Sequence, residues 1–364
     1  MNDSISRRQA VAIGFVALLS PLIRRFPRTM AEQIGRSAYL SVLFSVIPLT
    51  LRFLLYRWIF SRQKAGTGLA DIFCLSFGKG VGRAVCILYA LWFSFYAGFL
   101  LRSGADRFII TVFHGASAWI FIISMLLLCL PAALGQVRYL GRSAMIFRPL
   151  MAAVLLLITV SGFLSIDLSP LLPVTASDLL PNAYGALETA NVLAVVFYLA
   201  FLRRNIEGKF RCRDYLGWGI CLLLILFLIT TACIGMFGAH LTGKLTFPFF
   251  MLVRDVGALG SLERIEPMVI AIWVFSDFVI ISLLLYLAGT LLGFGFGMPN
   301  SGKPGRQWLT AAGAAASCVT ALFCAKSLAA FRFLSEDLVP LLNAVFVFAI
   351  PLICAVTGKV RKKL

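Results

Sequence analysis

Residues 267–292 read PMVIAIWVFSDFVIISLLLYLAGTLL and carry one charged side chain, Asp277. A helix needs about 20 mostly apolar residues to cross the roughly 30 Å hydrocarbon core of a bilayer. This stretch is long enough and predicts a membrane-spanning helix. The whole chain has the same character, because 60% of its 364 residues are hydrophobic and only 13% are charged. That composition leaves too little polar surface for a soluble globule of this size.

Apolar stretches of similar length tile the rest of the chain. We predict an all-α integral membrane protein with about ten transmembrane helices, and a shorter apolar run at 245–253, which contains Pro248, as an interfacial helix or re-entrant turn. The ten predicted spans are residues 9–23, 37–56, 84–101, 115–134, 149–166, 189–202, 215–237, 267–292, 307–325 and 338–358.

The net charge of +18 comes from cations that fall in the gaps between these spans. No basic cluster is interleaved with stacking aromatics, which argues against nucleic acid as a partner and leaves the lipid bilayer as the main one. About two thirds of the Lys and Arg residues collect on one side, and this side is cytoplasmic by the positive-inside rule. We therefore expect a multi-pass protein of the inner membrane of a spore or cell, with both termini cytoplasmic. Arg24, Arg102 and Arg107 are assigned to outer loops, and the Arg-rich loop at 24–28 either contacts headgroups, is buried in protein or binds an anion.

Ten spans with both ends inside predict a five-plus-five inverted repeat within a single transmembrane domain, residues 1–364. Residues 1–166 form the first repeat, residues 189–358 the second, and residues 359–364 a basic cytoplasmic tail. In transporters built this way, broken helices at matching positions hold the substrate. The shortest spans here are the first and the sixth. The first contains Gly14 and reaches Ser20 and Pro21, where the proline removes a backbone donor and should unwind the helix.

Polar residues inside spans add candidates, since ionisable groups at membrane depth tend to mark function. Trp273 and Asp277 are one turn apart, so the carboxylate could bind an ammonium group, a proton or an Arg of another helix. Glu188 and Asn191 also share a face, as ligand partners or as plain helix-end groups. Arg52 is expected to reach the cytoplasmic interface, and a role in gating is the alternative. The predicted ligand-binding residues are Gly14, Ser20, Pro21, Tyr96, Glu188, Asn191, Trp273, Ser276 and Asp277.

Catalytic patterns are missing from the sequence. There is no nucleophile with a nearby base, no metal-ligand spacing and no phosphate-binding glycine loop, because the FGKGVG stretch at 77–82 follows no predicted strand. The nine cysteines form no CxxC pair and are expected to be reduced. We predict that the chain is not an enzyme and needs no cofactor or metal.

Three motifs carry a resemblance to a known family. They are Gly35-Arg36-Ser37-Ala38-Tyr39-Leu40-Ser41, FGKGVGR at 77–83, and a segment with Pro248, Arg254, Gly257 and Leu262-Glu263-Arg264-Ile265-Glu266 before Trp273. In this order they resemble the B subunits of spore germinant receptors, the endospore germination permeases of the amino acid-polyamine-organocation superfamily. The first outer loop is more Arg-rich here, and the loop before helix six is proline-rich rather than motif-bearing, which leaves the ligand open.

The resemblance implies a subunit of the inner spore membrane that works with partner A and C subunits. It further implies a small-molecule germinant such as an amino acid, bound among helices one, three, six and eight. Sensing of this solute, which triggers germination, is the function we expect. Two alternatives remain: a proton- or ion-coupled amino acid permease using the same site, and a scaffold without a ligand. For a docking role toward partners the candidates are Arg254, Glu263 and Arg264.

Overall fold

The protein is described by a computed structural model that covers residues 3–24, 26–61, 63, 66–163, 166–167, 169–208, 212–258, 266–298, 303–324 and 328–361. Within these ranges the regular elements are helices, with one isolated bridge between Ile5 and Ile206. The predicted all-α class is confirmed. The helices are α1 (Arg7–Arg24), α2 (Phe26–Gln33), α3 (Tyr39–Phe44), α4 (Val46–Phe60), α5 (Leu69–Phe77), α6 (Lys79–Thr111), α7 (Ala118–Leu134), α8 (Val137–Phe163), η1 (Ser169–Leu171), η2 (Ala176–Asp178), α9 (Leu179–Val192), α10 (Val195–Tyr198), η3 (Leu199–Asn205), α11 (Cys212–Lys244), α12 (Pro248–Ala258), α13 (Glu266–Gly295), α14 (Lys303–Phe323), α15 (Leu328–Phe333), η4 (Leu334–Leu338), α16 (Val339–Ala344), η5 (Val345–Ala349) and α17 (Ile350–Val360).

Seven helices in the described part of the chain are long and apolar enough to cross a membrane, or up to eight if the bent pair α1 and α2 forms one span. The protein is therefore a multi-pass membrane protein. All ten predicted spans fall on helices, but α7 is a shorter apolar helix and α14 is not among the seven. The count of ten and the five-plus-five repeat remain predictions.

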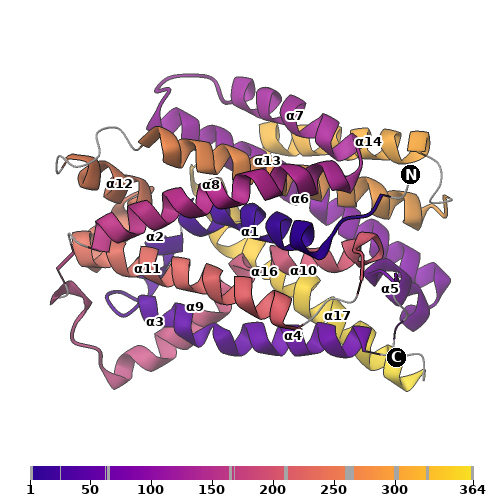
Figure 1. Ribbon diagram of the computed structural model, residues 1–364, viewed down its shortest axis with the longest axis horizontal. Coiled ribbons are helices and arrows are strands. Elements are labelled where there is room, and N and C mark those ends of the chain that lie inside the picture. The colour runs from indigo at the N-terminus through magenta and orange to yellow at the C-terminus, as the bar shows by residue number, and fades with distance from the viewer. Residues whose placement is uncertain are drawn as a thin grey trace.

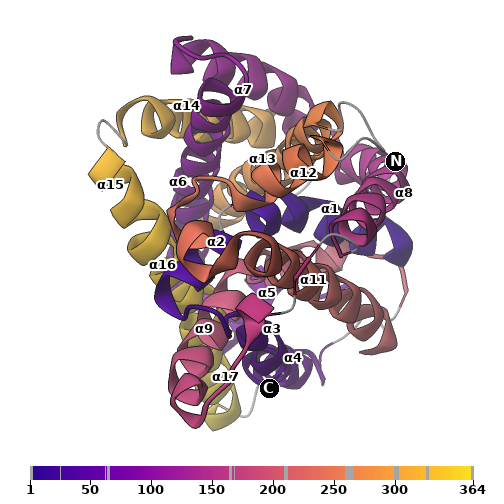
Figure 2. The same ribbon diagram turned by 90° about the vertical axis from the view of Figure 1, so that its left-hand side faces the viewer.

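The long helices run along one direction, and both ends of the chain lie at the same end of the bundle (Figure 1). At the opposite end lie α2 and α12, the short helix in the region predicted to be interfacial. Seen from that end, α1 lies inside the bundle and packs against α8, α13 and α11 (Figure 2). All residues from Ala12 to Arg24 are buried, which is how a helix apolar on every side is accommodated.

The first predicted span does not unwind at Ser20 and Pro21, contrary to our expectation. Helix α1 continues through Pro21 to Arg24, and the chain bends by 48° between α1 and α2. A hydroxyl from another helix is inserted into the α1 ladder instead. Ser276 on α13 accepts the Ser20 N–H at 2.7 Å and donates to the Val16 carbonyl at 2.7 Å. The Ser276 hydroxyl thus bridges the Ser20 N–H and the Val16 carbonyl, which are four residues apart in α1. A side chain inserted in this way is a recognised cause of bending in a helix.

The sixth predicted span is interrupted. Helix α9 ends at Val192, α10 begins at Val195, and the chain then continues as the 3-10 helix η3. Arg52 of α4 lies at this break and donates to the Ala190 carbonyl and to the side-chain oxygen of Asn191. It is 5% exposed, so the expectation that it reaches the interface is wrong. The carbonyl end of a helix carries partial negative charge, which attracts a guanidinium to the break.

The C-terminal helix, residues 328–360, contains two wide π-type turns in series. In η4 the N–H of Val339 bonds to the Leu334 carbonyl, and in η5 the N–H of Ile350 bonds to the Val345 carbonyl, each five residues back. Each wide turn ends two residues before a proline, Pro340 or Pro351. A proline ring clashes with the carbonyl four residues earlier, which favours widening of the preceding turn. The six-residue α16 lies between the two turns.

Close helix packing in this bundle depends on glycine. A Cβ on Gly98 of α6 would lie 2.5 Å from the Ser317 backbone oxygen of α14. We expect Gly98→Ala to lower the free energy of unfolding by about 1–3 kcal/mol through overpacking, measured by detergent-solubilised unfolding. Gly80→Ala on the same helix is the control, because no atom lies within 4 Å of its Cβ position. Equal effects of the two changes would contradict the packing argument.

Candidate functional site

A small cavity of about 80 Å³ lies where α1 meets α2, bordered by α6, α9, η4 and α16. Because one water molecule needs about 10–15 Å³ of such volume, the cavity has room for several waters or a small solute. Its lining residues come from α1 and α2, from α6, from the sixth predicted span and from the C-terminal helix. They are Pro21, Arg24, Phe26, Thr29, Met30, Tyr96, Phe99, Glu188, Asn191, Val192, Ser335, Glu336, Val339, Pro340 and Asn343.

The polar wall of the small cavity has charges of both signs. Arg24, 9% exposed at the end of α1, donates to the Ser103 hydroxyl at 2.5 Å and lies 5.7 Å from the centre of the Phe99 ring. Glu188 of α9 and Glu336 of η4 contribute carboxylates. A guanidinium and carboxylates around one cavity match a solute that itself carries both an anionic and a cationic group.

The aromatic wall is held by a chain of buried hydrogen bonds. Trp92 donates its indole N–H to the Tyr198 hydroxyl at 2.8 Å, and Tyr198 donates to the side-chain oxygen of Asn343 at 2.6 Å. Tyr96 stacks on Trp92 with ring centres 5.4 Å apart. These contacts fix two lining side chains, Tyr96 and Asn343, and so give the cavity a defined shape.

A buried ion pair lies next to the cavity. Arg107 of α6 contacts the Asp277 carboxylate of α13 and donates to the Ser20 hydroxyl at 2.7 Å. Its guanidinium carbon lies 5.0 Å from the centre of the Trp273 ring. Among the three partners that the sequence allowed for Asp277, the structure therefore has an Arg of another helix. The network joins α1, α6 and α13 through polar groups at the core of the protein.

Gly104 makes room for this pair. A Cβ there would lie 3.2 Å from the Asp277 carboxylate oxygen and 3.6 Å from Arg107. Within the described part of the chain, three buried polar atoms of the network have no hydrogen-bond partner: Arg107 Nε, Asp277 Oδ1 and Trp273 Nε1. Buried groups left unsatisfied in this way are costly, so the pair is closely tied to the packing around it.

The predicted site residues divide into three groups. Pro21, Tyr96, Glu188 and Asn191 line the small cavity, whereas Ser20, Trp273, Ser276 and Asp277 belong to the ion-pair network. The two groups meet where Ser20 is followed by Pro21. Gly14 belongs to neither, since its Cβ position lies 3.0 Å from Leu199 and 3.2 Å from Trp218. Arg254 is exposed on α12, and Glu263 and Arg264 lie outside the described residues.

Sequence reasoning missed Arg24, Arg107, Glu336 and Asn343. The first two were assigned to outer loops, but α1 continues to Arg24 and α6 continues past Arg107 to Thr111. A signal was present, because spacings of three and four place on one helix face the residues Tyr96, Phe99, Ser103 and Arg107. Asn343 is a polar residue inside the predicted span 338–358, which is a weaker signal of the same kind, whereas Glu336 lies just before that span and had no such signal.

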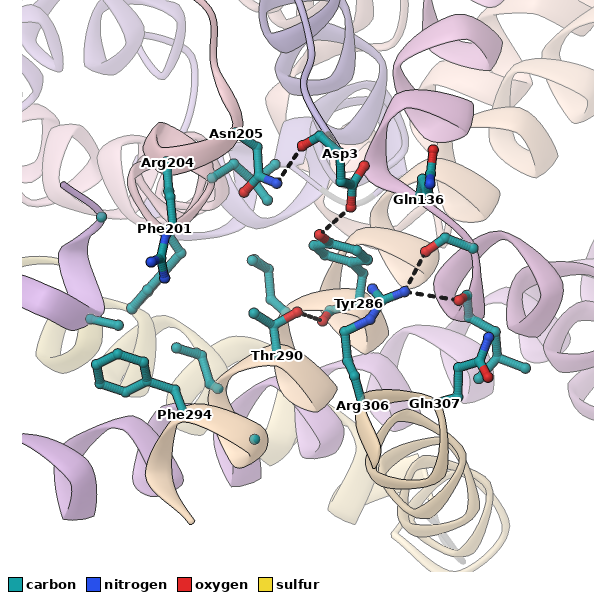
Figure 3. Close-up of a pocket in the computed structure, with 18 of the residues that line it drawn as sticks. Asp3, Gln136, Phe201, Arg204, Asn205, Tyr286, Thr290, Phe294, Arg306 and Gln307 are labelled. Atoms are coloured by element: carbon teal, nitrogen blue, oxygen red, sulfur yellow. Dashed lines mark hydrogen bonds between the residues drawn. The ribbon is translucent and has the colours of Figure 1, made fainter. Parts of the chain in front are cut away.

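A larger cavity of about 830 Å³ is lined by Asp3 and Ser4, so it lies at the end of the bundle where Figure 1 marks the N-terminus, and Figure 3 shows residues that line it. Some of its polar groups bond to one another or to backbone carbonyls, as Figure 3 shows. Tyr286 donates to the Asp3 carboxylate at 2.8 Å, Asn205 donates to the Asp3 carbonyl at 2.6 Å, and Arg306 donates to the Gly135 carbonyl at 2.7 Å. None of the predicted ligand-binding residues lines it. In the part of the chain that the structure describes, no three His, Cys, Asp or Glu side chains gather as a metal site.

Comparison with known proteins adds one finding. A family model described as "Spore germination protein" matches residues 4–301, which is most of the chain. The match includes the helices that carry the ion pair and the α9 wall of the small cavity. No curated protein matched the chain in a sequence search.

Proposed function

The chain belongs to the spore germination protein family, and we propose that it is the membrane subunit of a spore germinant receptor that senses a small solute. The observation that carries the proposal is the small cavity, because it gathers Arg24, Glu188 and Asn191 at the bent first span and the interrupted sixth span. Binding there would shift a two-state equilibrium of the protein. Partner A and C subunits, the inner spore membrane and cytoplasmic termini are parts of this proposal, and exposed Arg254 is a candidate docking residue.

An amino acid suits the chemistry of this cavity. Its carboxylate would pair with the Arg24 guanidinium, and its ammonium group with Glu188 or Glu336. Tyr96 and Phe99 offer an apolar wall for a side chain. The volume of about 80 Å³ favours a small one.

The ion pair between Asp277 and Arg107 favours sensing over coupled transport. A proton- or ion-coupled permease would use Asp277 or Glu188 to bind the coupling ion, but the Asp277 carboxylate is already paired with the fixed guanidinium of Arg107. Because Arg107 occupies this carboxylate, a coupling cation would have to displace the guanidinium and leave it buried without a counterion. Uptake of labelled amino acids into proteoliposomes under a pH gradient, lost in Asp277→Asn, would instead establish the permease.

Ligand binding is expected to raise the melting temperature of the purified subunit. We expect a specific shift with one class in a panel of amino acids, sugars and nucleosides, since a ligand at 100 times its Kd adds about 2.7 kcal/mol to stability. Glu188→Gln should reduce that shift severalfold by removing a charged partner. Asp255→Asn is the matched control, because this carboxylate is exposed on α12.

Two outcomes would count against the sensor. A shift of equal size in wild type and Glu188→Gln would place the ligand outside the small cavity. No shift with any solute, in the subunit alone or with partner subunits added, would favour the scaffold, whose docking would then depend on Arg254, Glu263 and Arg264.

A further inference from the structure

The C-terminal helix departs from regular α-helical geometry at two places on either side of a short α-helical segment. It contains two wide turns, η4 and η5, and the short α16 lies between them. The first wide turn and α16 supply Ser335, Glu336, Val339, Pro340 and Asn343 to the wall of the small cavity. The second wide turn lies beyond the cavity, toward the end of the bundle where the C-terminus is found (Figure 1).

A wide turn changes the rotation of the residues that follow it. An α-helix turns by about 100° and rises 1.5 Å per residue, so adding or removing one residue in a turn rotates the next segment by about that angle. Two wide turns in series can compensate each other. The segment between them can then rotate about the helix axis while the segments outside keep their places.

The position of α16 is fixed by a few identifiable hydrogen bonds. On the cavity side Asn343 accepts from the Tyr198 hydroxyl at 2.6 Å. At the second wide turn Tyr89 donates to the Phe346 carbonyl, and Tyr56 donates to the Val347 carbonyl at 3.2 Å. Backbone carbonyls in regular helices bond along the helix, so side-chain hydroxyls at both neighbouring carbonyls fit a turn whose ladder has been opened.

We propose that α16 is a rotary coupling between the small cavity and the other end of the bundle. A solute that contacts Val339, Pro340 and Asn343 sets the rotation of α16. This rotation moves the η5 carbonyls that accept hydrogen bonds from Tyr89 and Tyr56. Helix α17 follows η5 and packs against α4 and α5. The inference rests on the proposed function for the identity of the stimulus, but the mechanical coupling between η4 and η5 is a property of the chain itself.

The coupling can be tested without a ligand. In the full-length protein, hydrogen exchange of the Val345–Ala349 amides is compared between wild type and the Tyr56→Phe, Tyr89→Phe double variant. Loss of the hydroxyls should speed exchange there about two- to tenfold, as expected for ordinary hydrogen bonds. The decisive readout is Leu334–Leu338, at the far side of α16, where exchange should also rise. Tyr139→Phe is the control, because this tyrosine is exposed on α8.

Faster exchange confined to Val345–Ala349 would overturn the proposal, because the two wide turns would then be independent. If the double variant fails to fold, Tyr56→Phe alone serves, since Tyr56 is 8% exposed and Tyr89 fully buried. A solute that raises the melting temperature should change exchange at Val345–Ala349 in wild type only, while the melting shift persists in the variant. Failure of every solute to bind would remove the sensor and leave the exchange test of the coupling intact.

Discussion

Asp277→Asn is expected to lower the free energy of unfolding by about 3–5 kcal/mol, because it breaks a buried ion pair. The change leaves the Arg107 guanidinium, 1% exposed, without its counterion. Unfolding of the purified protein in mixed detergent micelles measures the loss. Asp106→Asn is the matched control, because its pair with Arg102 spans 3.0 Å at partly exposed positions, and exposed pairs contribute about 0–1 kcal/mol.

A double variant separates the charge from the packing. Arg107→Met combined with Asp277→Asn removes both charges and keeps much of the volume, so it should regain most of the stability lost in the single variant. A double variant as unstable as Asp277→Asn would show that the hydrogen bond from Arg107 to Ser20, and not the buried charge, holds the three helices together. Either result assigns the energy of the network to a particular contact.

The sequence was sufficient for the fold class because a bilayer imposes a length on every span. It was less reliable for helix ends. The charges at Arg102, Asp106 and Arg107 suggested that helix three ends near residue 101, yet α6 continues to Thr111. Arg102 and Asp106 pair one turn apart, and Arg107 turns inward to Asp277. Charges that find partners inside the protein do not end a helix, and composition alone cannot show those partners.

The candidate site, like the helix ends, could be predicted from the sequence only in part. Local rules found Pro21, Glu188 and Asn191, because shortness and spacing along one helix are visible in the sequence. Their surroundings depend on contacts between distant segments. Glu336 and Asn343 lie about 150 residues after Glu188 and Asn191 in the sequence but share a cavity with them. The same holds for Arg52, which sequence placed at the interface and the structure places at the break of helix six.

Arg52→Met is expected to cost about 3 kcal/mol or more of unfolding free energy, since hydrogen bonds to a charged group contribute about 1.5–3 kcal/mol each and two are lost. The Ala190 carbonyl and the Asn191 side chain would both lose their donor. Because Asn191 lines the small cavity, the ligand-induced melting shift should fall together with stability. Arg57→Met, at an exposed position of the same helix, is the control and should change neither.

Arg52→Lys tests whether geometry or charge matters at the break. A guanidinium reaches two acceptors with one planar fork, whereas an ammonium group is a point charge. We therefore expect Lys to recover part of the stability but little of the ligand response, because Asn191 would be left to rotate. Full recovery of both by Lys would mean that the break needs only a cation. Loss of ligand response at wild-type stability would instead place Arg52 among the residues that shape the cavity without holding the fold.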